Sequence, residues 1–390
     1  MTHSQKRTIL FAALALVAAA LAFWIVKVTA ASTAGTPAVS ADSADTNTSD
    51  STAASTLSAA SAEFVFSDSG IAVTGSSSGT EISGTALTID EAGTYTVSGA
   101  CADGSIKIKK GTTGVTLILN GLDLTSSATA PITCGKSSEV AILAADGTEN
   151  VLTDSAQNND GKYPENTDAE NAVIKCKDGS TVTLGGTGSL RINANGKNGI
   201  KSGGATDEAG KASLTIEELT LTINAAVNDA INAEQALNIP SGTLTIAAAD
   251  DAIHADYDLN IGASGTDGPS ITITGCCEGL EAAALNIFSG NIDITATDDC
   301  LNAANSDLSG YDFTVNISGG TIDAYTSGGD GFDSNGDLTI SGGTVVVWTA
   351  SAADNQPLDA DGTITVTGGT VLAAGGSSGM GMNLSAAQPY

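Results

Sequence analysis

An acidic residue opens the same short phrase five times in the C-terminal half of the chain. The third residue of each phrase is Ile, Leu or Phe, and the phrases begin at Asp229, Asp251, Glu278, Asp299 and Asp330, with weaker copies at Asn198 and Gln356. Successive copies start 31, 22, 27, 21, 31 and 26 residues apart. Such a repeat is typical of a solenoid, in which equivalent positions stack on neighbouring turns. It therefore predicts a column of carboxylates that needs a cation to neutralise it.

Further oxygen ligands accompany these phrases. A second Asp precedes two of the copies, and the fourth residue adds Glu281, Asn302 and Asp333. Clustered oxygen ligands suit Ca²⁺. We expect calcium on at least one turn between residues 250 and 333, with ligands from this set: Asp250, Asp251, Glu278, Glu281, Asp298, Asp299, Asn302, Asp330 and Asp333. Each copy taken singly also fits an acidic turn without a ligand, because Asp and Asn favour tight bends.

Three residues in or near these phrases are not assigned as calcium ligands. Asp229 and Gln356 open copies at the margins of the repeat, which we interpret as ordinary turns. His254 takes the fourth position of its phrase, with Asp250, Asp251 and Asp256 nearby. It could be a ligand or a base, but a lone His in such a place favours an outward-facing side chain without that role.

The charge of the chain limits its partners. It has 44 acidic and 14 basic side chains and a formal net charge of -30. Nucleic acid is excluded as a partner, because its binding depends on Lys and Arg that neutralise phosphates. The last basic side chain is Lys211, and residues 212–390 contain 23 acidic residues and no Lys or Arg. Counter-ions or bound divalent cations must therefore balance this half of the chain.

The N-terminus is typical of an export signal. Lys6 and Arg7 precede an apolar run from Ile9 to Val26, and Val28–Ala30 resembles a small-residue cleavage site. Residues 1–30 are predicted to be either a cleaved signal peptide or a membrane anchor. The Ala/Ser/Thr-rich residues 31–62 predict a disordered linker. We therefore expect an extracellular or cell-surface protein that contacts the membrane only through its N-terminal segment.

Short strands dominate the rest of the sequence. Residues 63–110 alternate irregularly and predict an N-terminal β cap, because the first turn of a solenoid would otherwise expose an edge. From 111 to 376, Leu-x-Ile strands alternate with Gly-rich bends, which places Leu and Ile inward. This pattern predicts an all-β single-stranded parallel β-helix. A leucine-rich repeat would need a longer Leu signature that is missing, and residues 377–390 are predicted to be a tail.

Two pairs of side chains are aligned by the repeat. Cys134 and Cys176 occupy similar local sequences on neighbouring turns, where either a disulfide or two small buried thiols would fit. Tyr325 and Trp348 fall at the same outward position on consecutive turns, with Asp323 beside them. Aromatic rings in a row could stack on sugar rings, or could pack under a neighbouring loop or the tail.

Several of these motifs together resemble a known family. They are Phe64–Phe66, Gly93–Gly99, Val115–Asp123, Asp146–Asp154 and the acidic phrases. They look like the exported carbohydrate-binding β-helix family of anaerobic bacteria, which is similar to the calcium-dependent pectate lyases of family 9. The resemblance implies a right-handed parallel β-helix with calcium that binds cellulose-like or pectin-like polysaccharides.

The resemblance also bears on catalysis. The lyases hold calcium with an Asp-Asp-x-x-Asp phrase, which Asp298, Asp299 and Asn302 match, and they use a nearby Lys as base. No Lys follows Lys211 in this chain. We therefore expect a calcium-dependent polysaccharide-binding protein that is not an enzyme. Two alternatives stay open: a polysaccharide lyase with Lys201 or His254 as an atypical base, and a structural surface adhesin with a protein partner.

Overall fold

The computed structural model describes residues 60–204, 213–308, 310–350, 355–376 and 384–386. The predicted export segment, most of the predicted linker and most of the predicted tail lie outside these residues. Every named element in the described part of the chain is a strand. The described residues contain no helix that is long and apolar enough to cross a membrane.

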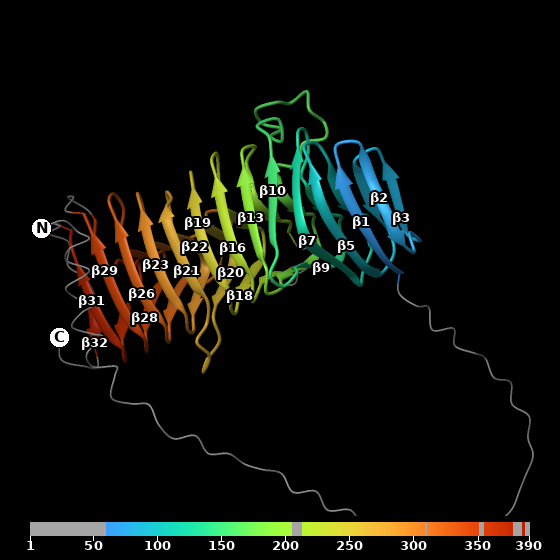
Figure 1. Ribbon diagram of the computed structural model, residues 1–390. Coiled ribbons are helices and arrows are strands. Elements are labelled where there is room, and N and C mark those ends of the chain that lie inside the picture. Colours follow the sequence, from blue (N-terminus) through green and yellow to red (C-terminus); the bar gives the residue numbers. More distant parts are fainter. Residues whose placement is uncertain (1–59, 205–212, 309, 351–354, 377–383, 387–390) are drawn as a thin grey trace, which may run out of the picture. The chain divides into compact units, whose positions relative to one another are not determined.

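Most strands pair in parallel with strands about one turn before and after them. Strand β10 (Glu149–Asp154), for example, pairs with β7 (Val115–Ser126) and with β13 (Ser189–Ala194). The result is three columns of strands, joined into one open sheet by long strands that run through two columns. Figure 1 shows strands of one column, such as β5 (Gly93–Cys101), β7 and β10, side by side. The all-β, mostly parallel architecture is confirmed and is compatible with the predicted β-helix. The right-handed coiling stays a prediction.

The first column carries the acidic phrases. It contains β4 (Ala86–Ile89), β6 (Ser105–Ile108), β8 (Ile132–Cys134), β11 (Ala172–Cys176), β14 (Asn198–Ser202), β17 (Ile231–Ala233), β24 (Leu301–Ala303) and β27 (Phe332–Ser334). The N-terminal parts of β20 (Ile253–Ile261) and β22 (Leu280–Ile287) belong to it as well.

The second column contains the C-terminal parts of β20 and β22. Its other strands are β9 (Glu139–Ala144), β12 (Thr181–Gly185), β15 (Ser213–Ile216), β18 (Ala236–Ile239), β25 (Thr314–Ile317), β28 (Asp337–Ile340), β30 (Ile364–Val366) and β32 (Leu384–Ala386).

The third column contains β7, β10 and β13 and runs from one end of the sheet to the other. Its other strands are β1 (Ala60–Ser67), β5 (Gly93–Cys101), β16 (Thr220–Ala225), β19 (Thr243–Ala248), β21 (Ser270–Gly275), β23 (Asn291–Ala296), β26 (Thr321–Thr326), β29 (Thr344–Thr349) and β31 (Thr370–Ala374). Near the N-terminus, β2 (Gly70–Gly75) pairs antiparallel with β1, and β3 (Thr80–Ser83) with β4. The capping role of this region stays a prediction.

Stacked apolar side chains fix the register of the first column. The third residues of the phrases lie above one another and are fully buried: Ile231, Ile253, Leu280, Leu301 and Phe332. Burying one such side chain contributes about 1.5–3 kcal/mol. A slip of one residue would turn all of them to solvent. The apolar stack therefore holds the polar residues of each phrase in line with those of the next turn.

Candidate metal centre and binding surface

The fourth residues of the phrases form a continuous series of register partners. His254 pairs with Asn232 on one side and with Glu281 on the other. A bridge between Phe332 and Leu358 places Asp359 next to Asp333 at the C-terminal end. We call the series the fourth-position ladder: Lys175, Lys201, Asn232, His254, Glu281, Asn302, Asp333 and Asp359. Its side chains are basic at Lys175 and Lys201, and all but Asn302 are acidic from Glu281 to Asp359.

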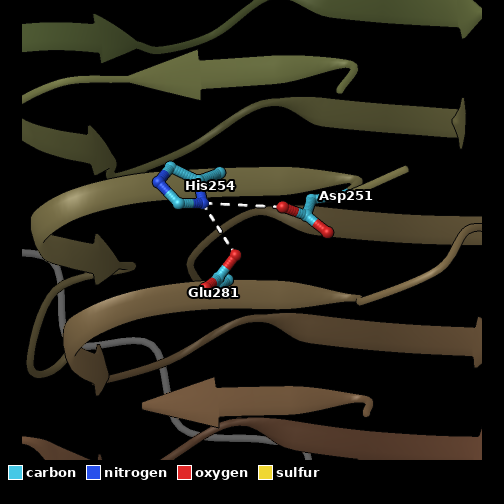
Figure 2. Close-up of side chains that lie close together, drawn as sticks. All are labelled: Asp251, His254 and Glu281. Atoms are coloured by element: carbon cyan, nitrogen blue, oxygen red, sulfur yellow. Dashed lines mark hydrogen bonds and ion pairs between the residues drawn. The ribbon is translucent and has the colours of Figure 1, made fainter. Parts of the chain in front are cut away.

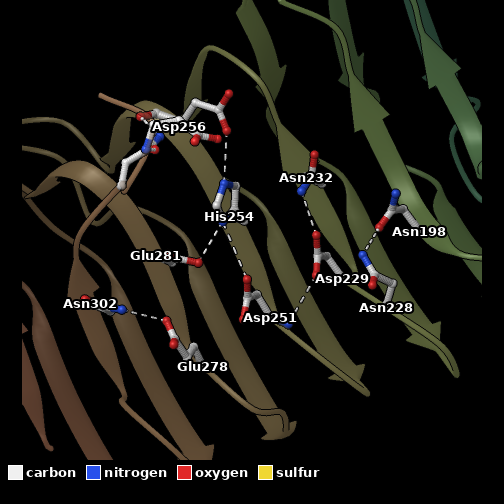
Figure 3. Close-up of polar contacts among 12 residues, drawn as sticks. Asn198, Asn228, Asp229, Asn232, Asp251, His254, Asp256, Glu278, Glu281 and Asn302 are labelled. Carbon is white, nitrogen blue, oxygen red and sulfur yellow. Dashed lines mark hydrogen bonds and ion pairs between the residues drawn. The ribbon is translucent and has the colours of Figure 1, made fainter. Parts of the chain in front are cut away.

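The first residues of the phrases stack in the same way. The amide after each one donates to the carbonyl of the first residue on the next turn, as Ala230 N does to Asp251 O at 3.0 Å. This first-position ladder contains Asn198, Asp229, Asp251, Glu278, Asp299, Asp330 and Gln356. The structure therefore stacks the phrases as the repeat predicts. Figure 3 shows members of both ladders on neighbouring strands.

His254 lies at the centre of three carboxylates. Its Nδ1 is 2.7 Å from Glu281 Oε2 and 3.5 Å from Asp251 Oδ2 (Figure 2), and its Nε2 is 3.0 Å from Asp256 Oδ1. Burial alone would lower the pKa of His254, but these three carboxylates raise it to about 12. That His254 has no role as a ligand or a base stays a prediction, but its side chain is not isolated, because Glu281 reaches it from the next turn.

Asp229 is more than a marginal turn. Its side chain is buried, and it accepts a hydrogen bond from Asn232 Nδ2 at 2.6 Å. Burial, together with the charge of Asp251, raises the pKa of Asp229 to about 6. Carboxylate oxygens of Asp229, Asp250 and Asp251 lie within 4.8 Å of one another. The first-position ladder therefore gathers acids at a turn that the sequence interpretation had left out.

A second group of acids lies at the C-terminal end of the ladders. Carboxylate oxygens of Asp330, Asp333 and Asp359 lie within 4.8 Å of one another, and all three residues are half-buried. Burial and the charge of Asp359 raise the pKa of Asp333. Asp359 belongs to the copy opened by Gln356, so sequence reasoning had missed it. Aligning the fourth residues of all copies would have found it.

The middle of the ladders also crowds acids together. Burial, with the charges of Glu281 and Asp251, raises the pKa of Glu278 to about 8. Burial, with the charges of Asp333 and Asp298, raises the pKa of Asp299 to about 7. The doubled acids Asp250 and Asp298 are exposed at the rim.

Asn302 carries an oxygen that the protein does not satisfy. Its Nδ2 donates to Glu278 Oε2 at 2.9 Å, while its Oδ1 is buried and has no hydrogen-bond partner among the described residues. On the ladder Asn302 is the register partner of two acids, Glu281 and Asp333, which offer no proton donor when ionised. A buried acceptor beside ionised acids fits a cation, so the donor set suits Ca²⁺.

The aromatic residues lie in the third column, away from the ladders. Tyr325 on β26 and Trp348 on β29 are register partners, and Asp323 pairs with Asp293 and Val346 at the outward position two residues earlier. Trp348 is 37% exposed, and Tyr325 is half-buried. The two rings thus stand on adjacent turns.

The two cysteines singled out in the sequence are also register partners. Cys134 on β8 pairs with Cys176 on β11, and both side chains are buried. The structure records them as free thiols. A disulfide between them stays a prediction.

Three comparisons with known proteins found similar chains. The model of a family described as "Carbohydrate-binding domain-containing protein" matches residues 83–379. A carbohydrate-binding domain-containing protein of Acetivibrio thermocellus is 37% identical over 123 residues, which cover 31% of this chain and 42% of that relative. This chain thus matches less than half the length of that relative. A solved structure described as a polysaccharide lyase-like protein from C. thermocellum, in a gadolinium derivative, is 25% identical with a TM-score of 0.41. That similarity covers 83% of this chain and 97% of the other.

Proposed function

We propose that this chain, which belongs to the family of carbohydrate-binding domain-containing proteins, binds a cellulose-like or pectin-like polysaccharide outside the cell without cleaving it. The observation that carries the binding surface is the alignment of Tyr325 with Trp348 on adjacent turns. Aromatic faces offer apolar area and a polar handle with few rotatable bonds, which suits the apolar faces of sugar rings. Asp323 adds a hydrogen-bond acceptor on the same face.

Calcium is the second part of the proposal. We place it on the acidic end of the two ladders, with Asp330, Asp333 and Asp359 as the main oxygen ligands and Asn302 as a further one. Calcium there would neutralise the crowded acids and hold successive turns in register. Its role is structural in this proposal, because the aromatic surface lies in a different column.

The side chains proposed as an atypical lyase base support the non-catalytic reading. Lys201 Nζ lies 2.9 Å from Glu234 Oε1 and 3.1 Å from Asn232 Oδ1. Both ring nitrogens of His254 face carboxylates, and the pKa of about 12 keeps the ring protonated at neutral pH. A general base must be unprotonated near the working pH, so neither residue suits the role as it stands.

A pull-down on insoluble cellulose, with a parallel assay on polygalacturonate, tests the proposal. Tyr325→Ala and Trp348→Ala should each weaken binding about 5- to 10-fold, equivalent to roughly 1 kcal/mol for a lost aromatic contact. Phe288→Ala is the matched control, because Phe288 is equally exposed at 38% but lies outside the aromatic pair. Unchanged binding in the first two variants, or an equal loss in the control, would contradict the proposed surface.

The lyase alternative has its own readout in the same samples. Cleavage by elimination creates an unsaturated product that absorbs in the ultraviolet. Incubation of the calcium-loaded protein with polygalacturonate should produce no such absorbance. Steady accumulation of the product, lost in Lys201→Ala or His254→Ala, would replace the binding proposal with the lyase.

A further inference from the structure

We propose that Asp251, His254 and Glu281 form a site for a borderline divalent metal such as Zn²⁺, separate from the calcium ligands at the acidic end of the ladders. This site does not depend on polysaccharide binding. It also assigns Asp251 and Glu281 to a different metal from the one that the sequence predicted for them.

The ligand atoms come together from two adjacent turns. His254 Nδ1, a carboxylate oxygen of Asp251 and one of Glu281 lie within 4.8 Å of one another, and Figure 2 shows the three side chains converging. Asp251 and His254 come from the turn that contains β20, and Glu281 comes from β22. Their side chains are 14%, 19% and 18% exposed, respectively, so the site is sheltered but reachable.

The ligand types favour zinc over calcium. Calcium takes oxygen ligands, whereas imidazole nitrogen suits Zn²⁺ and its neighbours in the first transition row. Three protein ligands with a position left open match the zinc sites that bind water or a further ligand. The open position could accept a hydroxyl or carboxylate oxygen.

Asp256 supplies the outer partner that such a site needs. A metal-binding His usually donates its other ring N–H to a carboxylate, which fixes the tautomer and the orientation of the ring. Asp256 Oδ1 lies 3.0 Å from His254 Nε2 and leaves Nδ1 facing Asp251 and Glu281 (Figure 3). In the metal-free protein Nδ1 carries a proton toward these carboxylates, and the bound metal would take the place of that proton. The backbone of Asp256 is itself held, because its carbonyl accepts a hydrogen bond from Asn305 Nδ2 at 3.0 Å.

No other turn of the fourth-position ladder offers an imidazole nitrogen beside carboxylates. The preceding turn carries Asn232 at the same register, and the turn after Glu281 carries Asn302. His254 is the only His in residues 212–390. The nitrogen ligand is therefore confined to one turn, next to acids that belong to both ladders.

Cobalt is the probe for the test, because bound Co²⁺ absorbs visible light. The full chain is stripped with chelator, saturated with millimolar Ca²⁺ to fill the oxygen sites, and titrated with Co²⁺ and, by calorimetry, with Zn²⁺. We expect a visible Co²⁺ band that saturates at one equivalent. Absence of the band, or its displacement by the calcium present, would overturn the proposal.

Three variants assign the band to this site. His254→Asn copies Asn232 and Asn302 at the same ladder position, so the variant should fold, and it should lose the band. Asp256→Asn keeps all three ligands and should weaken Co²⁺ and Zn²⁺ binding about 10- to 100-fold. Asp267→Asn removes the same charge from an exposed loop and should bind as the parent does. A band that survives in His254→Asn would overturn the proposal.

Discussion

The lysine-bearing and the acid-bearing turns share one ladder position but neutralise their charge differently. At the lysine end, Lys201 lies 2.9 Å from Glu234, and Lys177, two residues after the ladder residue Lys175, lies 2.6 Å from Glu170. At the acidic end, Glu281, Asp333 and Asp359 hold the position of Lys201, and the sequence contains no Lys or Arg after Lys211. The same backbone therefore places lysine ion pairs at one end, whereas we propose that bound calcium neutralises the crowded acids at the other.

The difference teaches that the repeat specifies geometry more strictly than charge. The apolar third residues keep every turn in register, whatever stands at the fourth position. Partly exposed ion pairs contribute little, about 0–1 kcal/mol each. Crowded half-buried acids cost more, because each unit of pKa shift represents about 1.4 kcal/mol. The stability of the acidic end should therefore depend on calcium and pH far more than the stability of the lysine end does.

Calcium removal is expected to have the largest effect and to act on one end only. At a calcium concentration 100 times its dissociation constant, binding stabilises the folded state by about 2.7 kcal/mol. Hydrogen-exchange mass spectrometry with and without chelator should show lost protection in β24 and β27 and none in β11 and β14. Equal loss at both ends, or no loss at all, would contradict the comparison.

The pH response of the calcium-free protein should be the next largest. The pKa of Glu278 is raised to about 8 and that of Asp299 to about 7. Because the folded state holds these protons more tightly, their stabilising contribution is complete below about pH 4 and is lost as the pH rises through 7 and 8. Calorimetry should show a melting temperature that falls over this range, because the free energy of unfolding drops by about a few kcal/mol in total after solvent screening.

Saturating calcium provides the control for that experiment. When calcium neutralises the acids, the fall in melting temperature between about pH 5 and pH 8 should shrink. A melting temperature that rises with pH in the chelated protein would have the wrong sign and would show that the acids are paired in some other way.

Introducing a lysine at the acidic end should make the charge balance of the two ends alike. Asn302→Lys places at the acidic end the side chain that Lys201 provides at the lysine end, between Glu281 and Asp333. We expect the calcium-free variant to be about 1.5–3 kcal/mol more stable than the parent, the range for hydrogen bonds to charged groups. Its gain from calcium, measured by denaturant unfolding, should fall by at least half.

Asn302→Gln is the control for the introduced lysine, since it lengthens the side chain without adding charge. Its gain from calcium should stay close to that of the parent. If Asn302→Lys leaves the gain from calcium unchanged, calcium lies elsewhere on the ladder than we propose.

The sequence predicted the stacking because the signal is repeated on every turn. The apolar third residues and the acidic first residues recur together, so their alignment follows from the period alone. The pairing of Tyr325 with Trp348 follows for the same reason. The coiling hand was inferred only from resemblance, since no residue pattern in the repeat encodes it.

Contacts between turns were harder to predict. Asp229 and Asp359 belong to copies that look incomplete when read singly, because Asn232 and Gln356 are neutral. Their partners come from neighbouring turns, as Asp359 shows by joining Asp330 and Asp333. The contact between His254 and Glu281 was missed for the same reason, because Glu281 is 27 residues away along the chain. Ligands therefore have to be sought down each ladder position rather than along each phrase.

The smallest effect is expected at the lysine end. Lys201→Gln removes the ion pair with Glu234, but the two side chains are 23% and 36% exposed, so the cost should be at most about 1 kcal/mol. Glu234 keeps a hydrogen bond from Gly204 N at 3.0 Å, which further limits the loss of stability. A double-mutant cycle with Glu234→Gln, followed by denaturant unfolding, measures the pair directly. A coupling well above 1 kcal/mol, or new calcium dependence of exchange in β14, would mean that the two ends differ in degree rather than in kind.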